Sequence, residues 1–154
     1  MSLEVIDQIL FAINKFKIKT IDLTGGAPEL NDHFEYLIIE AKNLGCHVID
    51  RCNLTVLLEP GKAHLFDFFK NNKVEIIASL PCYEESNVDA QRGKNVFKKS
   101  IKALRELNKF GYGYKKDLAI NLIYNPQGPV LPPNQLDLEK KYKKILKEEH
   151  DIIF

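Results

Sequence analysis

The chain has 154 residues, of which 45% are hydrophobic and 28% charged, a balance typical of one globular domain with its own hydrophobic core. Its net charge of +1 gives no electrostatic reason to expect nucleic acid or an anionic membrane as a partner. No apolar run approaches the roughly 20 residues that span a bilayer, and the N-terminus lacks a basic segment with a cleavage site, so we expect a cytoplasmic protein.

Hydrophobic periodicity divides the chain into alternating helices and strands. Apolar residues at helical spacing predict a first helix over Leu3 to Phe16, with Ser2 as its N-cap. The other predicted helices share this period and lie at about 34–44, with Asn31 as cap and Gly45 after it, and at 59–72, 95–109 and 135–149. Runs of β-branched and apolar residues predict strands at 18–23, 46–51, 73–81 and 118–124, the third buried on both faces, and the beginning of a fifth at 151–154. Segments 82–93 and 125–135 are predicted to be loops, the second because it is rich in proline.

Strict alternation of strands and helices with short connections predicts an α/β fold with a parallel sheet built from right-handed βαβ units. Two architectures fit this pattern, an open doubly wound sheet and an arc of a (β/α) barrel. In either one, ligands bind beyond the carboxyl ends of the strands. Open edges of apolar strands favour pairing with a second copy, so a homo-oligomer is expected.

Paired glycines follow the first predicted strand in "TIDLTGGAPELN", at Gly25 and Gly26. Because they lack Cβ atoms, they allow backbone N–H and C=O groups to approach a ligand closely, which suits an amino-acid moiety or a phosphate. The alternative is a tight turn that needs one positive φ angle. Neither GxGxxG nor GxxxxGK[ST] occurs, so the pair alone identifies no ligand.

The three cysteines form neither a CxxC motif nor an even set, which argues against a disulfide framework and against a self-contained zinc or iron–sulfur site. Cys46 and Cys52 have even spacing around a strand and are expected to share one face, as core residues do. Cys82 follows a strand and a proline, so we expect it to be accessible at the carboxyl rim and to react with an alkylating agent before Cys46. A thiol-dependent hydrolase with His47 or His64 as base is an alternative, although the sequence places neither histidine.

Taken together, these segments resemble the radical S-adenosylmethionine enzymes, and within them the arsenosugar-biosynthesis subfamily with a cysteine-rich C-terminal region. "DLTGGAPELN" is similar to that family's GGE-type motif, and "IDRCNLTVLLEPG" stands in the place of its TNG-type segment. "VEIIASLPCYEESNVDAQRGKNVFKKSIKALRELNKFGYG" resembles the fourth barrel strand and the helix that follows it, with a Ser-Leu pair, an Arg-Gly and a Phe-led helix. "INLIYNPQGPVLPP" resembles the fifth strand and its loop, so the likeness runs from Ile18 to Phe154.

The resemblance implies a partial (β/α) barrel of TIM type with parallel strands in sequential order, and S-adenosylmethionine as the cofactor. It implies that Gly25 and Gly26 approach the methionyl end of this cofactor. The residues expected to bind the cofactor are Gly25, Gly26, Glu29, Asn53, Ser79 and Arg92. The residues expected to face a small-molecule substrate are Cys52, Cys82, Tyr124 and Asn125.

The chain departs from the family at the [4Fe–4S] cluster, which the family holds on a CxxxCxxC loop after the first strand. No such loop occurs here, and the cysteines present have the wrong spacing, so no metal ligand is expected. We therefore expect the chain to correspond to the middle of such an enzyme, without the first strand, the cluster loop and the C-terminal region.

The expected function is thus to supply part of the S-adenosylmethionine and substrate site of a radical enzyme. The subfamily suggests adenosyl transfer to an organoarsenic compound, and the chain alone is expected to be inactive. The alternatives are a noncatalytic small-ligand-binding α/β module and a thiol-dependent enzyme centred on Cys82.

Overall fold

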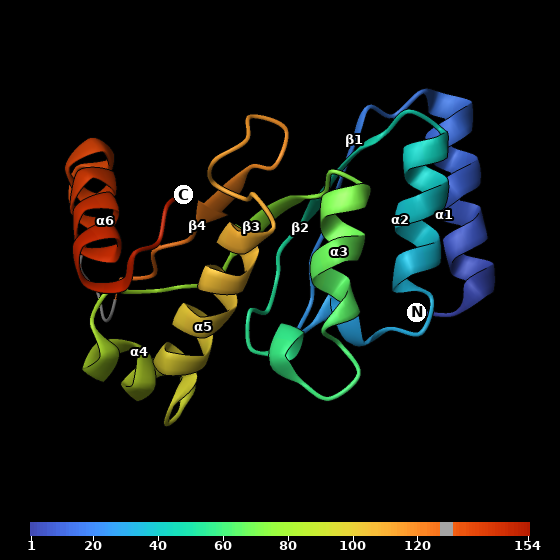
Figure 1. Ribbon diagram of the computed structural model, residues 1–154. Coiled ribbons are helices and arrows are strands. Elements are labelled where there is room, and N and C mark those ends of the chain that lie inside the picture. The colour runs from blue at the N-terminus through green and yellow to red at the C-terminus, as the bar shows by residue number, and fades with distance from the viewer. Residues whose placement is uncertain (127–130) are drawn as a thin grey trace.

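A computed structural model of the chain describes residues 1–126 and 131–154. Helices and strands alternate along these residues, as the periodicity predicts (Figure 1). The elements are α1 (Leu3–Phe16), β1 (Thr20–Leu23), the 3₁₀ helix η1 (Pro28–Leu30), α2 (Phe34–Asn43), β2 (His47–Asp50), the 3₁₀ helix η2 (Val56–Leu58), α3 (His64–Asn71), β3 (Glu75–Ala78), α4 (Glu85–Arg92), α5 (Val96–Lys109), β4 (Ile120–Leu122) and α6 (Gln135–His150).

The four strands form a single sheet in the order β1-β2-β3-β4, and every neighbouring pair is parallel. The predicted α/β class and the sequential strand order are therefore confirmed. The order does not reverse among the described strands, whereas reversal around a central crevice characterises a doubly wound sheet. Each strand is followed by a helix that returns the chain to the opposite end of the sheet, so all the loops that follow strands gather at one end (Figure 1).

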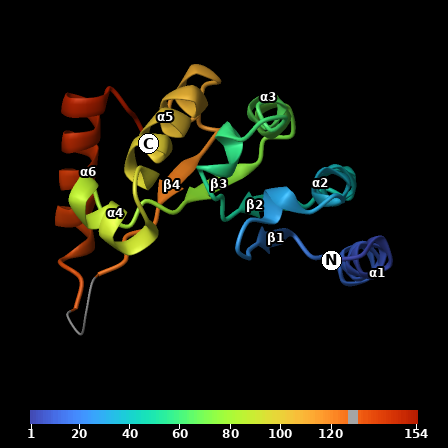
Figure 2. The same cartoon turned by 90° about the horizontal axis from the view of Figure 1, so that it is seen from below.

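One face of the sheet is buried under helices and the other is open. The register places Ile21 beside Val48 and Asp50 beside Ile76. Helices α2, α3 and α5 lie over one face of the sheet (Figure 2), and Val48 and Ile76 belong to the hydrophobic core, against which Ile21 packs. No described helix covers the opposite face (Figure 2). The prediction that the third strand is buried on both faces was wrong, because its residues alternate between buried and partly exposed. Helix α1 packs on α2 through its own apolar stripe of Ile6, Leu10 and Ile13.

Two further expectations about the elements were wrong. Segment 82–93 contains a helix, α4, whose only buried residue is Val88, so it lacked the apolar periodicity that predicts helices. Residues 151–154 do not form a strand; Asn108 holds them instead, bonding both the N–H and the carbonyl of Ile153. Of the predicted proline-rich loop at 125–135, residues 127–130 lie outside the described part, and the rest has no regular structure before α6 begins.

Candidate functional site at the carboxyl ends of the strands

The glycine loop lies directly after β1 and opens onto a cavity. Gly25 and Gly26 have no positive φ angle, and a Cβ built on either would meet no atom within 4 Å. The turn interpretation, which required a positive φ at one glycine, is therefore wrong. A cavity of about 250 Å³ lies beside them, lined by Leu23, Pro28 and Phe34 among others. Neither a positive φ angle nor a close neighbour within the described chain therefore requires glycine at these two positions.

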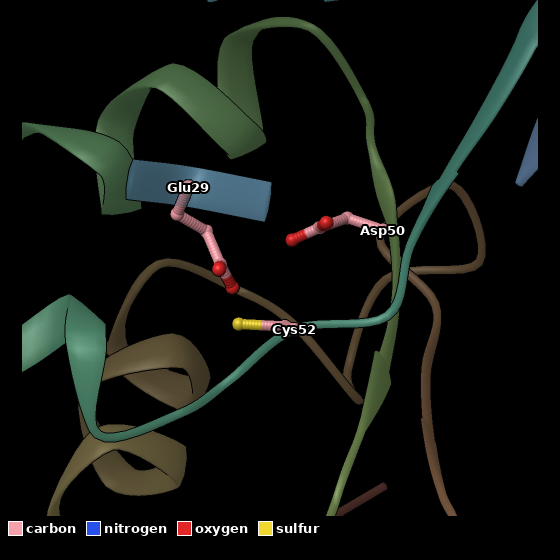
Figure 3. A group of neighbouring side chains, drawn as sticks. All are labelled: Glu29, Asp50 and Cys52. Atoms are coloured by element: carbon pink, nitrogen blue, oxygen red, sulfur yellow. The ribbon is translucent and has the colours of Figure 1, made fainter. Parts of the chain in front are cut away.

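A second feature of this rim is a buried cluster of Glu29, Asp50 and Cys52. Glu29 belongs to η1, Asp50 ends β2, and Cys52 lies two residues further on an extended segment, so the last two side chains point the same way. Figure 3 shows the two carboxyls and the thiol directed toward a common point, and their ligand atoms all lie within 4.8 Å of one another. All three side chains are at most 1% exposed.

Burial and mutual repulsion dominate the electrostatics of this cluster. Burial, with the neighbouring charges of Glu29 and Asp22, raises the pKa of Asp50 to about 8. Burial, followed by the charges of Asp50 and Glu29, raises the pKa of the Cys52 thiol well above its usual value. Both groups therefore hold their protons at neutral pH when nothing else occupies the cluster.

The cluster changes the interpretation of Glu29, Cys52 and Asn53. The Asn53 backbone N–H donates to Oε1 of Glu29 at 2.8 Å, and the Asn53 side chain accepts a bond from the Thr55 hydroxyl. Glu29 and Cys52 were expected to face cofactor and substrate, but both side chains are buried and point into the cluster. The sequence analysis missed Asp50; its even spacing from the buried Val48 was the available signal.

The candidates that follow β3 lie apart from the glycine loop. Ser79 is half-buried after the strand, and Arg92 is exposed at the last residue of α4 rather than in a loop. Helix α4 lies on the β4 side of the sheet, away from β1, in both views (Figures 1 and 2). The structure therefore does not bring Arg92 together with Gly25 and Gly26.

The expectation that Cys82 is accessible was wrong, because only 6% of it is exposed. Helix α6 covers the segment after β3: the Tyr142 hydroxyl donates to the carbonyl of Leu80, and Tyr142 packs edge-on against Tyr83. The three cysteines are all buried and free. His47 pairs with Glu75 and His64 with Glu35, so neither histidine serves Cys82 as a base.

The fourth strand leads to a second, more aromatic cavity. Tyr124 is half-buried and contacts Tyr142, and both line a space of about 330 Å³ between β4 and α6, together with Phe154. Asn125 is exposed, and its backbone N–H donates to the carbonyl of Pro81. Among the expected substrate-facing residues, Tyr124 is therefore the one that lines a described cavity.

The open face of the sheet carries charged pairs that the sequence analysis did not anticipate. Arg51 donates three hydrogen bonds of 2.8–3.1 Å to the carboxylate of Asp22. The side chains of His47 and Asn121 both bond to Glu75, which lies between them. This face therefore carries charged and polar side chains near both ends of the strands.

Comparison of the sequence with models of known protein families and with curated proteins finds no match. None of the described helices combines the length and apolarity needed to cross a membrane.

Proposed function

We propose that this chain supplies part of an S-adenosylmethionine site at the carboxyl ends of the strands of a TIM-type partial barrel. The sequential parallel order of β1 to β4 supports it, because a barrel requires that order. The open polar face would then form part of the interior wall. The resemblance of the loop segments to radical S-adenosylmethionine enzymes supplies the identity of the ligand.

The observation that carries the proposal is that no φ angle and no close contact requires glycine at positions 25 and 26. Their φ angles are available to any residue and their Cβ positions are empty, so neither turn geometry nor packing explains two consecutive glycines. Close approach of a ligand to the backbone does explain them. The backbone groups of this loop are then the part of the site that contacts the cofactor.

The charged pair beside this loop matches the methionyl end of the cofactor. Asp22 is in β1, three residues before Gly25, and Arg51 directly follows β2 on the same open face. A carboxylate and a guanidinium can receive the ammonium and the carboxylate of an amino-acid moiety, respectively. The cavity of about 250 Å³ is smaller than most sites for nucleoside-sized ligands, so the rest of the cofactor would extend over the open face.

The residues present do not fit a [4Fe–4S] cluster. Cys46 precedes β2 and Cys52 follows it, and six extended residues separate their thiols by about 20 Å. The one described group of ligand atoms contains a single cysteine. We therefore derive no radical step for this chain, and its proposed share of the chemistry is to bind and orient the cofactor. Adenosyl transfer to an organoarsenic compound remains a proposal that depends on the subfamily likeness alone.

Titration of ¹⁵N-labelled protein with S-adenosylmethionine, followed by backbone amide spectra, tests the proposal. The amide signals of Gly25 and Gly26 should shift with a weak, saturable dependence on ligand concentration. The double variant Gly25→Ala/Gly26→Ala fills the empty Cβ positions without a clash in the chain, so it should stay folded and lose the shifts. Gly45→Ala adds the same methyl group at the other end of the sheet and should retain them.

Two results would count against this function. An absence of shifts at the glycine loop would remove the proposed ligand. Shifts confined to Tyr124, Tyr142 and Phe154 would instead favour the noncatalytic ligand-binding module, with the aromatic cavity between β4 and α6 as its site.

A further inference from the structure

The cluster of Glu29, Asp50 and Cys52 is electrostatically incomplete. Oε2 of Glu29 and both carboxyl oxygens of Asp50 are buried without a hydrogen-bond partner among the described residues. Buried polar groups in native proteins are almost always paired, because an unpaired one is costly to bury whether or not it is ionised. Two such groups facing each other require a partner that brings positive charge or protons.

Two basic residues adjoin the cluster, Lys62 through the backbone of Glu29 and Arg51 through the chain between Asp50 and Cys52, and both are engaged elsewhere. Lys62 directs its ammonium to the backbone carbonyl of Glu29, at 2.7 Å, rather than to the carboxylate. Arg51 is paired with Asp22 on the opposite, open face of the sheet. Neither cation therefore neutralises the cluster.

We infer that Glu29, Asp50 and Cys52 bind a single divalent metal ion, with zinc as the preferred occupant. Three ligand atoms within 4.8 Å of one another surround a space that an ion at about 2.0–2.3 Å from each ligand can occupy after a small contraction. A thiolate with two carboxylates suits zinc, whereas magnesium and calcium take oxygen ligands almost alone. This metal site shares no residue with the proposed cofactor site of Gly25, Gly26, Asp22 and Arg51. It lies on the face of the sheet that the helices cover.

Binding is an exchange of protons for metal bonds, with no change of oxidation state. The Cys52 thiol and the Asp50 carboxyl release their protons to the buffer as zinc–sulfur and zinc–oxygen bonds form. The ion would join η1 to the end of β2. Because Glu29 is three residues after Gly26, it would also fix the loop that carries the two glycines.

The test uses the full chain, freed of metal with a chelator and then titrated with Zn²⁺ and with Co²⁺. We expect one ion per chain by calorimetry and by metal analysis. At free zinc about 100 times Kd, Tm should rise by about 8 °C. Bound Co²⁺ should show a thiolate-to-metal charge-transfer band, because Cys52 is a ligand.

Matched variants assign the ligands. Cys52→Ser should abolish the charge-transfer band, whereas Cys46→Ser, which changes another buried thiol outside the cluster, should leave it intact. Asp50→Asn should weaken Zn²⁺ binding by about 100-fold or more, and Asp22→Asn, at an exposed carboxylate, should not.

Three outcomes would overturn the inference. They are a wild-type protein that binds no zinc or cobalt, a charge-transfer band that persists in Cys52→Ser, and equal zinc affinity in Asp50→Asn and wild type. The wild-type titration decides the question even if a cluster variant fails to fold, since one bound ion and a charge-transfer band are required of it. A negative zinc titration does not by itself contradict the proposed cofactor site, which the amide shifts of Gly25 and Gly26 test separately.

Discussion

Asp50 combines complete burial with a carboxyl group that has no hydrogen-bond partner in the described chain. Its position follows from ordinary strand geometry, because it occupies the same face of β2 as the buried Val48. An apolar residue of similar size would be less costly to bury at this position. The same reasoning applies to Glu29, which is buried on a short 3₁₀ helix although most glutamates are exposed.

Metal-free protein should lose stability as pH rises from about 4 to about 8. The pKa of Asp50 is raised from 3.8 when unfolded to about 8 when folded, so between these values the folded state holds a proton that the unfolded state has released. The stability is therefore complete below the lower pKa and falls by up to about 1.4 kcal/mol per pH unit above it. Urea unfolding at several pH values in the presence of chelator measures this slope.

Asp50→Asn provides the comparison for that slope. The amide does not titrate, so the variant should be flatter with pH than wild type over the same range. Asp117→Asn should keep the wild-type slope over this range, because the pKa of Asp117 is lowered by its bond to Lys73 and its charge is not among those that raise the pKa of Asp50. Parallel pH profiles for wild type and Asp50→Asn would show that Asp50 is not the titrating group.

Among the elements, those with clear periodicity could be predicted and those without it could not. Helix α5 has apolar residues such as Phe97, Ile101 and Leu104 at helical spacing, and it begins within one residue of its prediction. Helix α4 buries only Val88 and is defined instead by its context: the Asp89 carboxylate accepts bonds from the backbone N–H groups of Asn95 and Phe97. These bonds depend on the backbone conformation between Asp89 and Phe97, which the amino-acid composition of the segment does not reveal.

Contacts distant in sequence explain the error at Cys82. The strand that precedes it was predicted correctly, but Tyr142, 60 residues later, lies over that segment and removes it from solvent. At the candidate site, the glycine loop could be predicted from its own residues. The meeting of Glu29 with Asp50 and Cys52 required the positions of β1, η1 and β2 relative to one another.

Gly113 should be the glycine whose replacement is most damaging to the C-terminal segment. A Cβ on Gly113 would collide with the backbone carbonyl of Ile153, and its φ of +79° is itself unfavourable for alanine. Gly45 has nearly the same φ, +77°, and an empty Cβ position. Gly45→Ala should therefore cost about 1 kcal/mol through φ alone, and Gly113→Ala clearly more, because residues 151–154 must move.

Urea unfolding of the two alanine variants measures this difference directly. Fast hydrogen exchange at the Ile153 N–H, which donates to Asn108 in the folded chain, should accompany Gly113→Ala and not Gly45→Ala. Equal losses of unfolding free energy would mean that the collision is relieved without displacing the segment.

At the scale of the whole molecule, the sheet is covered on one face only. The accessible surface of 8988 Å² exceeds the roughly 8,000 Å² expected for a compact chain of 17.7 kDa. The sheet also leaves two strand edges, at β1 and β4, without a described neighbour. A surface of this kind is suited to contact with additional protein, whether another segment or a second copy.

The β1 edge should support concentration-dependent self-association. Lys19 and Leu23 direct their carbonyls to β2, so Thr20 and Asp22 turn their backbone groups outward, where a strand of another copy can pair with them. Thr20→Pro removes one outward N–H without breaking a bond to β2 and should reduce association, whereas Thr20→Val should retain it. Light scattering from micromolar to millimolar protein measures this, and a monomer at every concentration would contradict the prediction.

The last prediction is that the chain alone assembles no [4Fe–4S] cluster. Its thiols are buried at separate places, with Cys46 and Cys52 at opposite ends of β2, and cluster assembly requires several thiolates converging on one centre. Anaerobic reconstitution with iron and sulfide should therefore leave no stoichiometric acid-labile sulfide, and reductant with S-adenosylmethionine should yield no 5′-deoxyadenosine.

Sulfide is the decisive readout, because a single iron ion at Glu29, Asp50 and Cys52 adds iron without sulfide. The triple variant Cys46→Ser/Cys52→Ser/Cys82→Ser should match wild type in sulfide content. About four sulfides per chain, lost in that variant, would show that the cysteines converge after all.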